Sequence, residues 1–499
     1  MKREVNLTAD VAIVGYGPTG ATLANLLAQY GIKVIVIERE AAVYHLPRAV
    51  HFDGETMRVF QTVGIADQLS EKVYVNPGMR FVDAGGDLIL DWPRPQEIGP
   101  QGWYASYRLH QPDLEKLLRE KCLGYATVKE LSCTEVVSLT EGTDSVTLNC
   151  LNLHDQQAMT VKAQYVVGCD GARSLVRDVI GAELDDLGFE ERWLVVDVLL
   201  KRDRPDLGDH SIQFCNSTRP MTYCRSPANR RRWEITLLED ETDQEMNQDE
   251  RIWEFLKPWI STEDATIERS AIYTFRSVIA KQWRSSRLMI AGDAAHLTPP
   301  FMGQGMCAGI RDAANLAWKL ALCVKKQTST KILDSYQKER SPNVREFIET
   351  AIRLGKLINT IDKQSALAQA DTSQSRTAKM ASIAPTLGSS RLGDLLPEYD
   401  SPHQGQLFAQ PKLIDGRRLD DVVGYGPVLI LREQLPNGIV STIPSFDADE
   451  HPQFLKWLNE IGTNALLIRP DRYIAASATT TVDIAKIAAT NWPEFTQLN

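Results

Sequence analysis

Three glycines near the N-terminus have the spacing that lets a polypeptide wrap around a phosphate group. Gly15, Gly17 and Gly20 form a G-x-G-x-x-G sequence that also contains Pro18 and Thr19. The first two glycines allow a tight turn and a close backbone approach to a pyrophosphate, and the third lets a helix pack closely on a strand. The amides and the dipole at the start of that helix favour a negative charge. The spacing therefore predicts a dinucleotide-binding turn, although a purely structural glycine-rich turn has the same pattern.

The residues around these glycines predict the strand, helix and second strand that such a turn requires. Residues 10–16 and 33–38 are apolar, largely β-branched runs typical of buried parallel strands. Between them, ATLANLLAQYG repeats leucines at helical spacing and ends at a glycine. Glu38 ends the second strand, where a carboxylate suits a hydrogen bond to a ribose diol. This unit predicts dinucleotide binding but does not distinguish NAD from FAD.

Two later segments, each following a predicted strand, narrow the choice of cofactor. Asp170, Ser174 and Arg177 form a D-G-x-x-S-x-x-R segment, and Asp293 and His296 belong to a G-D-A-A-H segment. With the glycine-rich turn, these motifs resemble those of the class A FAD-dependent aromatic hydroxylases, the family of para-hydroxybenzoate hydroxylase and phenol hydroxylase. That family carries the three motifs in this order and at similar distances, and the resemblance covers about residues 8–360. The resemblance implies FAD as the cofactor.

The resemblance also implies roles at the cofactor for individual residues. In the family, the counterpart of Asp293 bonds the ribityl chain of FAD, and the segment around Asp170 lies near the pyrophosphate and is implicated in handling NAD(P)H. The loop over 299–306 lies along the isoalloxazine in the family, with its amides near O2 and N3. We therefore expect a cofactor-binding set of Gly15, Gly17, Pro18, Thr19, Gly20, Glu38, Arg39, Arg48, Gln111, Asp170, Asp293, Pro299, Gly303, Gly305 and Met306.

Three polar residues near these motifs also have ordinary structural interpretations. Arg48 matches the family arginine of a P-R-A segment close to the pyrophosphate, but it also suits a solvated surface charge. Gln111 matches the family glutamine on the ribityl side, but it also suits a polar residue at a helix start. His296 matches a family position near the cofactor and not a proton relay, and we expect it to be structural.

The resemblance further implies a reaction. In the family, NAD(P)H reduces FAD, O2 adds to the flavin, and the resulting flavin C4a-hydroperoxide hydroxylates an electron-rich ring. The expected enzyme is therefore an FAD-dependent NAD(P)H aromatic hydroxylase, a monooxygenase acting on a small phenolic or aromatic substrate. Asp53 matches an active-site aspartate of phenol hydroxylase and is a candidate to accept the phenol proton, although it also suits a helix cap. His51 and Tyr273 are further catalytic candidates, and both are residue types that often serve in packing.

The substrate is less closely defined than the cofactor. Residues 47–65 and 299–324 most resemble 3-(3-hydroxyphenyl)propionate hydroxylase and its relatives, which act in bacterial breakdown of aromatic acids. Phe301 and Met302 depart from the bulky polar or aromatic residue common in that loop. The alternative is a flavin oxidoreductase or oxygenase on the same scaffold that acts on a non-phenolic, polyketide or heteroaromatic substrate. A scaffold protein without flavin is a third hypothesis, which the intact glycines, Glu38 and Asp293 disfavour.

The bulk composition is that of a globular enzyme. The chain has 499 residues, a hydrophobic fraction of 43% and a formal net charge of −10, which disfavours broad nucleic-acid binding. Its eight cysteines form no C-x-x-C pair, so neither a metal site nor a dithiol centre is expected. The sequence has no signal-peptide pattern and no membrane-spanning apolar run. We expect a cytoplasmic protein without nucleic-acid or membrane partners, and the resemblance makes a homodimer the candidate assembly.

The predicted fold class is α/β, built from three parts. A Rossmann-like (GR2-type) FAD-binding domain is expected over residues 1–180 and 275–360, with an amphipathic helix at 309–326. Strand-like stretches predict an antiparallel substrate-binding sheet over 181–274, joined by parts of 75–110. Residues 361–399 have the composition of a linker or helical wrap. Residues 400–499 resemble the thioredoxin-like C-terminal domain of phenol hydroxylase and contain no C-x-x-C pair, so a structural role is expected.

Overall fold

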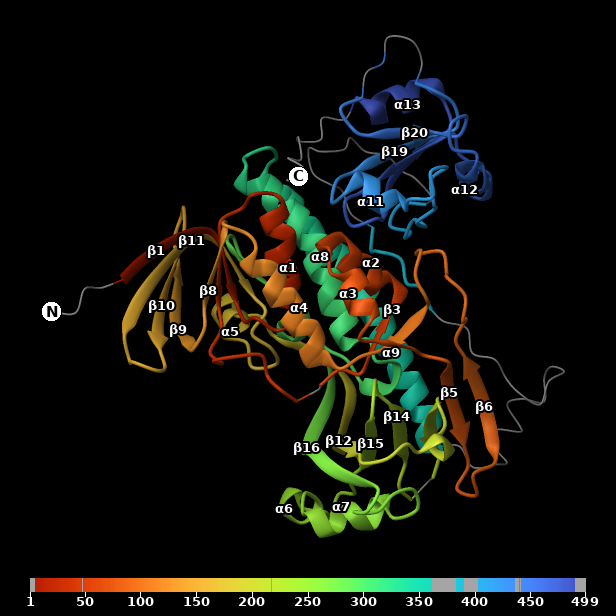
Figure 1. Ribbon diagram of the computed structural model, residues 1–499. Coiled ribbons are helices and arrows are strands. Elements are labelled where there is room, and N and C mark those ends of the chain that lie inside the picture. The colour runs from red at the N-terminus through yellow and green to blue at the C-terminus, as the bar shows by residue number, and fades with distance from the viewer. Residues whose placement is uncertain are drawn as a thin grey trace.

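The computed structural model describes residues 5–46, 48–216, 218–360, 383–389, 403–435, 439 and 441–489. Within these ranges the strands form four sheets of a mixed α/β fold (Figure 1). Most of the linker or helical wrap expected over 361–399 lies outside the described residues. No helix in the described ranges is both long and apolar enough to span a bilayer.

The sheet that carries the glycine-rich turn is largely parallel and buried. β1 (Val5–Val14) pairs in parallel with β2 (Val34–Ile37) and with β11 (Ala158–Gly168). All four residues of β2 are buried, which explains why the strand is a continuous apolar run. The other strands of this seven-stranded sheet, as far as the structure describes it, are β8 (Val128–Leu131), β9 (Thr134–Glu141), β10 (Val146–Asn152) and β17 (Leu288–Ile290).

Helices pack against this sheet and against one another. α1 (Pro18–Gln29) follows the glycine-rich turn and contacts both α4 (Gln111–Leu123) and the almost completely buried α8 (Gly305–Val324). Figure 1 shows these three helices together near the centre of the molecule. The neighbouring helices are α2 (Gly54–Val63), α3 (Ala66–Ser70), α5 (Leu175–Ile180) and α9 (Asp334–Thr360).

A second, mostly antiparallel sheet lies below these helices in Figure 1. Its long strands β12 (Leu184–Leu200) and β16 (Ala265–Ala280) pair along almost their whole length and run from the centre of the molecule toward α6 (Asp243–Met246) and α7 (Asp249–Leu256). Among the described residues, the sheet is completed by β5 (Gly78–Val82), β6 (Leu88–Pro93), β13 (Ser211–Phe214), β14 (Met221–Arg225), β15 (Arg230–Thr236) and β18 (His296–Leu297).

A third sheet is short and has three strands in the described chain. It consists, in the described chain, of β3 (His51–Asp53), β7 (Ser106–Arg108) and β4 (Tyr74–Val75), with β7 in the middle. β3 leads directly into α2, because Asp53 accepts a hydrogen bond from the Thr56 amide and caps the helix.

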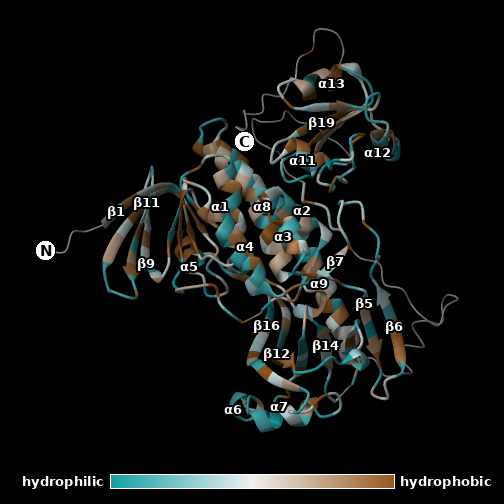
Figure 2. Cartoon of the chain, viewed as in Figure 1, coloured by the Kyte–Doolittle hydropathy of each residue, from teal (hydrophilic) through white to brown (hydrophobic). Residues whose placement is uncertain are grey.

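The C-terminal part of the chain forms a small sheet of its own. β19 (Val428–Leu431) pairs in parallel with β20 (Ser445–Asp447) and antiparallel with β21 (Ala465–Ile468), which pairs with β22 (Ile474–Ala478). All residues of β19 and β21 are buried, and Figure 2 shows the hydrophobic colouring of β19 beside more hydrophilic turns. The helices around this sheet are α11 (Leu419–Val423), α12 (Gln453–Ile461) and α13 (Thr481–Ala488).

Candidate active site

The glycine-rich turn lies where the carboxyl ends of four parallel strands meet. The Gly15 amide donates to the Ile37 carbonyl at the end of β2 over 2.8 Å. The Cys169 amide donates to the Val14 carbonyl over 2.8 Å, which joins the ends of β11 and β1. The Ala291 amide, after β17, donates to Gly168 over 2.9 Å. The segments that follow these strands are therefore brought to one edge, the usual ligand-binding edge of such sheets.

The three glycines of the turn differ in their surroundings. Gly15 has a φ of +98°, and a Cβ there would overlap the Cys169 carbonyl oxygen. A Cβ on Gly20 would overlap the Gly15 carbonyl oxygen, whereas one on Gly17 would meet nothing within 4 Å. Gly15 and Gly20 are thus required for packing, and Gly17 borders open space.

The start of α1 has backbone donors available for a negatively charged group. Gly17 is the N-cap and Pro18 the first helical residue, and no side chain caps the helix. Its first turn also holds no acidic residue. Thr19 lies against Gly292 and Gly309, so it fixes the helix start against the turn after β17. These features give α1 the unsatisfied amides that bind phosphate groups in other proteins.

Glu38 is held beside the turn by backbone hydrogen bonds. Its carboxylate accepts from the Tyr16 amide at 2.8 Å and from the Glu40 amide at 2.9 Å. Arg39, the next residue, points into solvent, with its side chain 71% exposed and paired with Glu40 at 3.3 Å. The structure thus brings Glu38 to the turn and leaves the Arg39 side chain on the surface.

Asp293 is exposed at the edge of the sheet where the parallel strands end. Its side chain is exposed to solvent, yet burial by surrounding protein raises the pKa of its carboxyl. We call the strand-end surface formed by Asp293 and the glycine-rich turn the cofactor cleft, because ligands of such sheets bind in the crevice at the strand ends. The nearby His296 and Arg48 oppose the rise, so Arg48, itself exposed, lies close enough to act on Asp293. The guanidinium of Arg48 is 5.0 Å from the ring centroid of Tyr44.

The segment after β11 is tied to the turn that holds Asp293. Arg177 donates to the Ala172 carbonyl at 2.9 Å and to the Ala294 carbonyl at 3.2 Å. Asp170 Oδ2 accepts from the Val176 amide at 3.2 Å, while its buried Oδ1 has no hydrogen-bond donor among the described residues. Burial raises the pKa of Asp170. The two motifs that supported the resemblance are therefore one structural unit.

The side chains of Gln111 and His296 both make contacts within the protein. Gln111 is the first residue of α4, and its side chain makes no cap: it accepts from the Ala49 amide at 2.6 Å and donates to Glu115 at 2.7 Å. It therefore fixes the segment that carries Arg48. His296 is buried and lies 2.7 Å from Asp312, an ion-pair geometry consistent with the structural role expected for it.

A cavity of about 680 Å³ lies between the second sheet and the loop that follows Asp293. His51, Arg94 and Arg108 form a basic wall, and the remaining lining includes the apolar Trp193 and Phe301. His51 Nε2 lies 2.8 Å from Ser106 Oγ, and its Nδ1 lies 3.3 Å from the carbonyl oxygen of Gly303. The other lining residues are Val50, Asn76, Gly78, Met79, Trp92, Ser211, Gln213, Thr222, Cys224, Glu234, Pro300, Met302 and Gly303.

The cleft and the cavity are connected by two segments of the chain. Residues 48–51 run from Arg48 at the cleft to His51 at the cavity, and residues 293–303 run from Asp293 to Gly303. Pro299 and Gly303 flank a single helical turn, and Gly305 and Met306 begin α8. A molecule in the cleft that followed these segments would reach the cavity wall.

The charged side chains that line the cavity are two arginines, Arg94 and Arg108, and one carboxylate, Glu234. Burial, followed by the charge of Arg108, lowers the pKa of His51 to about 3, so His51 is neutral near pH 7. Burial and Arg108 also lower the pKa of Arg94 to about 10. Since Arg108 contributes to both shifts, it lies close to His51 and to Arg94. The cavity is therefore suited to an anionic or readily ionised ligand.

The two remaining catalytic candidates lie behind or away from the cavity. Burial would raise the pKa of Asp53, but Arg311, 2.5 Å away, and the Thr56 amide lower it to about 2. Asp53 is therefore an ionised helix cap and is not part of the cavity lining. Tyr273 lies on β16, where the Arg269 guanidinium is 5.1 Å from its ring centroid, and it does not line the cavity either. Their catalytic roles stay predictions.

Sequence reasoning missed the cationic residues of the cavity region. Arg108 lies three positions before Gln111, in a segment singled out for the glutamine alone. Arg311 faces inward from α8 and is only 5% exposed. An arginine on the apolar side of a predicted helix will be buried and therefore needs a carboxylate partner inside the protein. This pattern could have identified Arg311 from the sequence. Arg94 follows a strand whose sequence contains no motif, so nothing in the sequence indicated a role in binding for this residue.

Comparison with other proteins identifies a matching family and relatives of similar sequence. Residues 8–351 match a family described as FAD binding domain. A probable NADH-specific resorcinol 4-hydroxylase of Rhodococcus jostii (strain RHA1) is 35% identical over 96% of this chain and 94% of its own length. A 3-(3-hydroxy-phenyl)propionate/3-hydroxycinnamic acid hydroxylase of Burkholderia cenocepacia (strain HI2424) is 32% identical over 95% of both chains.

Solved structures share the fold over nearly the whole chain. The flavin-dependent monooxygenase PieE, in complex with FAD and substrate, covers 97% of this chain and 98% of its own, with a TM-score of 0.79 at 20% identity. Aklavinone-11 hydroxylase, in a ternary complex with FAD and aklavinone, covers 98% of this chain and 99% of its own, with a TM-score of 0.78 at 20% identity. At this level of identity the likeness concerns the fold.

Proposed function

The chain belongs to the FAD binding domain family, and from this premise we propose that it is a monooxygenase that hydroxylates a small phenol with NADH and O2. Family membership confirms the FAD cofactor expected from the three sequence motifs. Relatives named as hydroxylases of resorcinol and of hydroxyphenylpropionate support the reaction type and the substrate class. The proposed reaction consumes a phenol, NADH, a proton and O2, and it yields the hydroxylated phenol, NAD⁺ and water.

The residues of the cleft fit an FAD molecule. The open space at Gly17 and the uncapped amides of α1 suit a pyrophosphate, and Glu38 suits a ribose. Asp293 suits the ribityl hydroxyls, and Asp170, at the end of the neighbouring strand, belongs to the same proposed set. When bound, FAD supplies the electron transfer between NADH and O2 that no amino-acid side chain provides. We propose that the remaining expected residues complete this site: Gly15, Pro18, Thr19, Gly20, Arg39, Arg48, Gln111, Pro299, Gly303, Gly305 and Met306.

The observation that carries the proposal is the cavity at the end of the cleft. Its lining combines aromatic side chains with a few polar groups that face the same space, as small-molecule sites do. Trp193 and Phe301 offer apolar contact to an aromatic ring, and Arg94 and Arg108 line the same cavity. Such a site would hold a ring in one orientation and displace water from around it, which limits side reactions with water.

The basic wall supplies the activation that a phenol requires. Arg94 and Arg108 favour the charged form of a bound hydroxyl group, so they lower the pKa of the substrate and increase the electron density of its ring. We propose that His51 contacts the substrate, because it lines the cavity. Asp53 then acts from behind His51 as an ionised carboxylate, and Tyr273 supports the sheet from which the cavity is built.

The same basic wall accommodates an acidic substituent on the substrate. A carboxylate, as in hydroxyphenylpropionate, pairs with a guanidinium, whereas resorcinol presents a second ionisable hydroxyl. The name of the Rhodococcus relative supports NADH as the electron donor. We propose a small phenol with a second acidic group as the substrate class.

The test measures oxidation of NADH and of NADPH by the FAD-loaded protein with resorcinol, with 3-(3-hydroxyphenyl)propionate, and with their O-methylated analogues. The expected result is faster NADH oxidation with one free phenol, no stimulation by its methylated analogue, and incorporation of one atom from isotope-labelled O2. Stimulated NADH oxidation without labelled product would contradict hydroxylation and favour the flavin oxidoreductase alternative. In Arg108→Ala, KM should rise for the productive phenol, while FAD content stays unchanged.

The chain organisation that we propose has three parts. An FAD-binding domain over 1–180 and 275–360 is supported by the seven-stranded sheet, and a substrate domain over 181–274 with parts of 75–110 by the eight-stranded one. The order β20–β19–β21–β22, with one parallel and two antiparallel pairs, supports a thioredoxin-like domain over 400–499. Since no cysteine follows Cys323, its proposed role is structural and not redox. A cytoplasmic homodimer, without nucleic-acid or membrane partners, is proposed as the assembly.

A further inference from the structure

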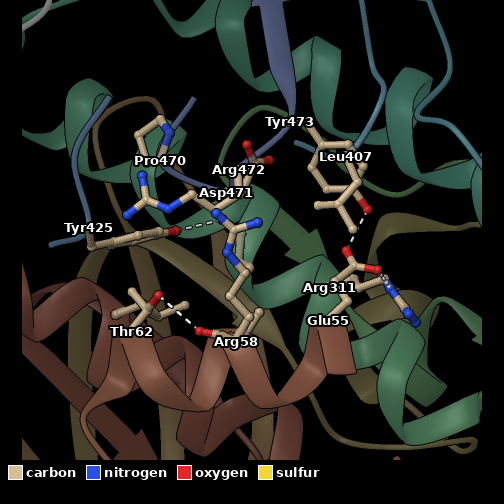
Figure 3. Close-up of a pocket in the computed structure, with 13 residues that line it drawn as sticks. Glu55, Arg58, Thr62, Arg311, Leu407, Tyr425, Pro470, Asp471, Arg472 and Tyr473 are labelled. Carbon is tan, nitrogen blue, oxygen red and sulfur yellow. Dashed lines mark hydrogen bonds and ion pairs between the residues drawn. The ribbon is translucent and has the colours of Figure 1, made fainter. Parts of the chain in front are cut away.

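A chain of hydrogen bonds and ion pairs links the C-terminal sheet to the candidate active site. Tyr473, directly before β22, donates its hydroxyl to Glu55 Oε1 at 2.6 Å. The other oxygen of Glu55 accepts from Arg311 Nε at 2.6 Å. Figure 3 shows Tyr473, Glu55 and Arg311 in this arrangement, beside a cavity of about 420 Å³ between the C-terminal part and helices α2 and α8.

Arg311 carries the connection further, to the start of α8 and to β3. Its Nη1 donates to Gln304 Oε1 at 3.0 Å, and its Nη2 donates to Asp53 Oδ2 at 2.5 Å. Gln304 is the N-cap residue of α8 and lies between Gly303 and Gly305 in the loop expected to face the flavin. One buried guanidinium therefore holds the end of that loop and the residue that caps α2.

The charges in this network explain why a hydroxyl donor is required at its outer end. Burial would lower the pKa of Arg311, but Asp53 and Glu55 raise it well above its usual value, so the guanidinium stays charged. One cation thus faces two carboxylates. Burial raises the pKa of Tyr473 well above its usual range, so the phenol keeps its proton and donates to Glu55. Without that donor, one oxygen of a largely buried carboxylate loses its hydrogen bond, and Glu55 no longer has one preferred orientation toward Arg311.

We propose that Tyr473 of the C-terminal domain is a positioning residue for the flavin-facing loop over 299–306, acting through Glu55 and Arg311 on Gln304. The proposal rests on the proposed hydroxylase function, since it gives the loop a task during turnover. The absence of cysteines suggested only a structural role for the C-terminal domain. The proposal gives the domain a second role, which is to position a loop of the active site. The domain fixes the loop from outside the cavity and touches neither substrate nor cofactor.

A second tyrosine at the same interface provides a matched control. Tyr425 donates its hydroxyl to the Ala314 carbonyl at 2.5 Å, so it also joins the C-terminal part to α8. Burial raises the pKa of both tyrosines well above the usual range. The bond from Tyr425 ends on the helix backbone and does not reach Arg311. Tyr473→Phe and Tyr425→Phe therefore each remove one buried hydroxyl between the same two parts of the chain.

The experiment compares these two variants with the wild type in their FAD-loaded forms. For Tyr473→Phe we expect a roughly ten-fold lower kcat with little change in the KM of the phenol, and a larger share of NADH oxidation that ends in hydrogen peroxide. The absorbance and fluorescence of the bound flavin should also shift. For Tyr425→Phe we expect a lower unfolding temperature with kcat, product yield and flavin spectrum close to those of the wild type.

A double-mutant cycle with Glu55→Gln separates the network from general destabilisation. If Tyr473 acts through Glu55, adding Tyr473→Phe to Glu55→Gln should change the flavin spectrum and the product yield little further. Additive effects, or equal effects of the two tyrosine variants on yield and spectrum, would overturn the proposal. If the wild type itself produces no hydroxylated phenol, the proposed function fails. The flavin spectra of the variants then still decide whether Tyr473 positions the loop.

Discussion

In the first βαβ unit, glycine serves either to allow close packing or to allow a positive φ. Substitution by alanine should affect FAD binding only at the packed position. In Gly20→Ala the new methyl group would overlap the Gly15 carbonyl oxygen, so we expect loss of the turn and of bound FAD. Gly31 has a φ of +70° but no neighbour within 4 Å of a Cβ, so Gly31→Ala should cost about 1 kcal/mol of stability and leave FAD bound. Visible absorbance of the purified variants measures the flavin content. Retention of flavin by Gly20→Ala would show that the turn tolerates a wider helix–strand spacing.

The buried imidazole of His51 should make the protein sensitive to acid. Its pKa is about 3 in the folded state and about 6.5 in an unfolded chain, so the unfolded state binds more protons between these values. Stability therefore falls as pH falls through this window, by about 1.4 kcal/mol per pH unit from this group alone. His51→Gln should reduce that slope, measured by chemical denaturation at several pH values.

The exposed His154 provides the control for this measurement. His154→Gln should keep the pH slope of the wild type. The same slope in His51→Gln as in the wild type would mean that His51 does not carry the effect. Asp53 acts in a lower window: its pKa of about 2 adds stability above about pH 4 that is lost on further acidification.

The residues that sequence reasoning found and those it missed differ in how the fold assembles them. Glu38, Asp170 and Asp293 each follow a strand end, and parallel strands bring their ends together by rule. Arg94 and Arg108 reach one cavity from β6 and β7, whose relative placement depends on tertiary packing between separate sheets. Local patterns therefore predicted the cofactor cleft but not the basic wall of the cavity.

At the scale of elements, α8 and α9 are joined to the C-terminal part by a buried ionic cluster. Glu339 on α9 accepts from Lys319 of α8 at 2.7 Å and from Arg469 at 2.9 Å. Asp471 pairs with Arg469 and accepts from Asn315 at 3.0 Å. Although burial opposes it, pairing with Arg469 and Lys319 lowers the pKa of Glu339 to about 2. Each charged group in the cluster therefore stays ionised because its oppositely charged partners lie beside it.

Removal of one charge from this cluster should be costly. Glu339→Gln leaves Lys319 and Arg469 buried with too little negative charge, and we expect a loss of about 3–5 kcal/mol of stability. Glu349→Gln, on the same helix but with its side chain 49% exposed, should change stability by less than about 0.5 kcal/mol. Unfolding in denaturant measures both. Similar losses in the two variants would contradict the dependence of the cluster on Glu339.

Element boundaries were predicted less well than element types. The helix expected at 309–326 begins at Gly305, because the chain turns into the helix directly after Gln304. The strand expected at 10–16 begins at Val5, because its partner β11 is long enough to pair with the polar residues before Asp10. The length of this strand and the order of strands in the second sheet both depend on pairing with strands that are distant in sequence. The local sequence pattern therefore could not predict them.

At the scale of the whole molecule, buried polar contacts bind the C-terminal part to the rest. Asp420 forms a bidentate pair with Arg58 of α2 at 2.6 and 2.9 Å, and Tyr30 of the first unit donates to the Tyr425 carbonyl at 2.5 Å. Both sides of these pairs are almost fully buried. Buried charges are little screened by salt, so ionic strength should not loosen this interface.

Heating should therefore unfold the molecule in one step. We expect flavin release, followed by fluorescence, and loss of secondary structure, followed by circular dichroism, to coincide in temperature at low and at high salt. A first transition that melts part of the secondary structure while the flavin stays bound would contradict this, and would mean that the C-terminal part unfolds independently.

The wide separation in sequence of the strands around the FAD cleft has a consequence for biosynthesis. β1 is made first, but its neighbour β11 ends at Gly168, and β17 and α8 follow only after residue 287. At roughly 5–20 residues per second, a ribosome needs on the order of tens of seconds to supply them. During that time the apolar β1 and α1 have no complete core to enter. We therefore expect the nascent chain to be a substrate of chaperones, and cofactor capture to be a late event that follows synthesis of α8.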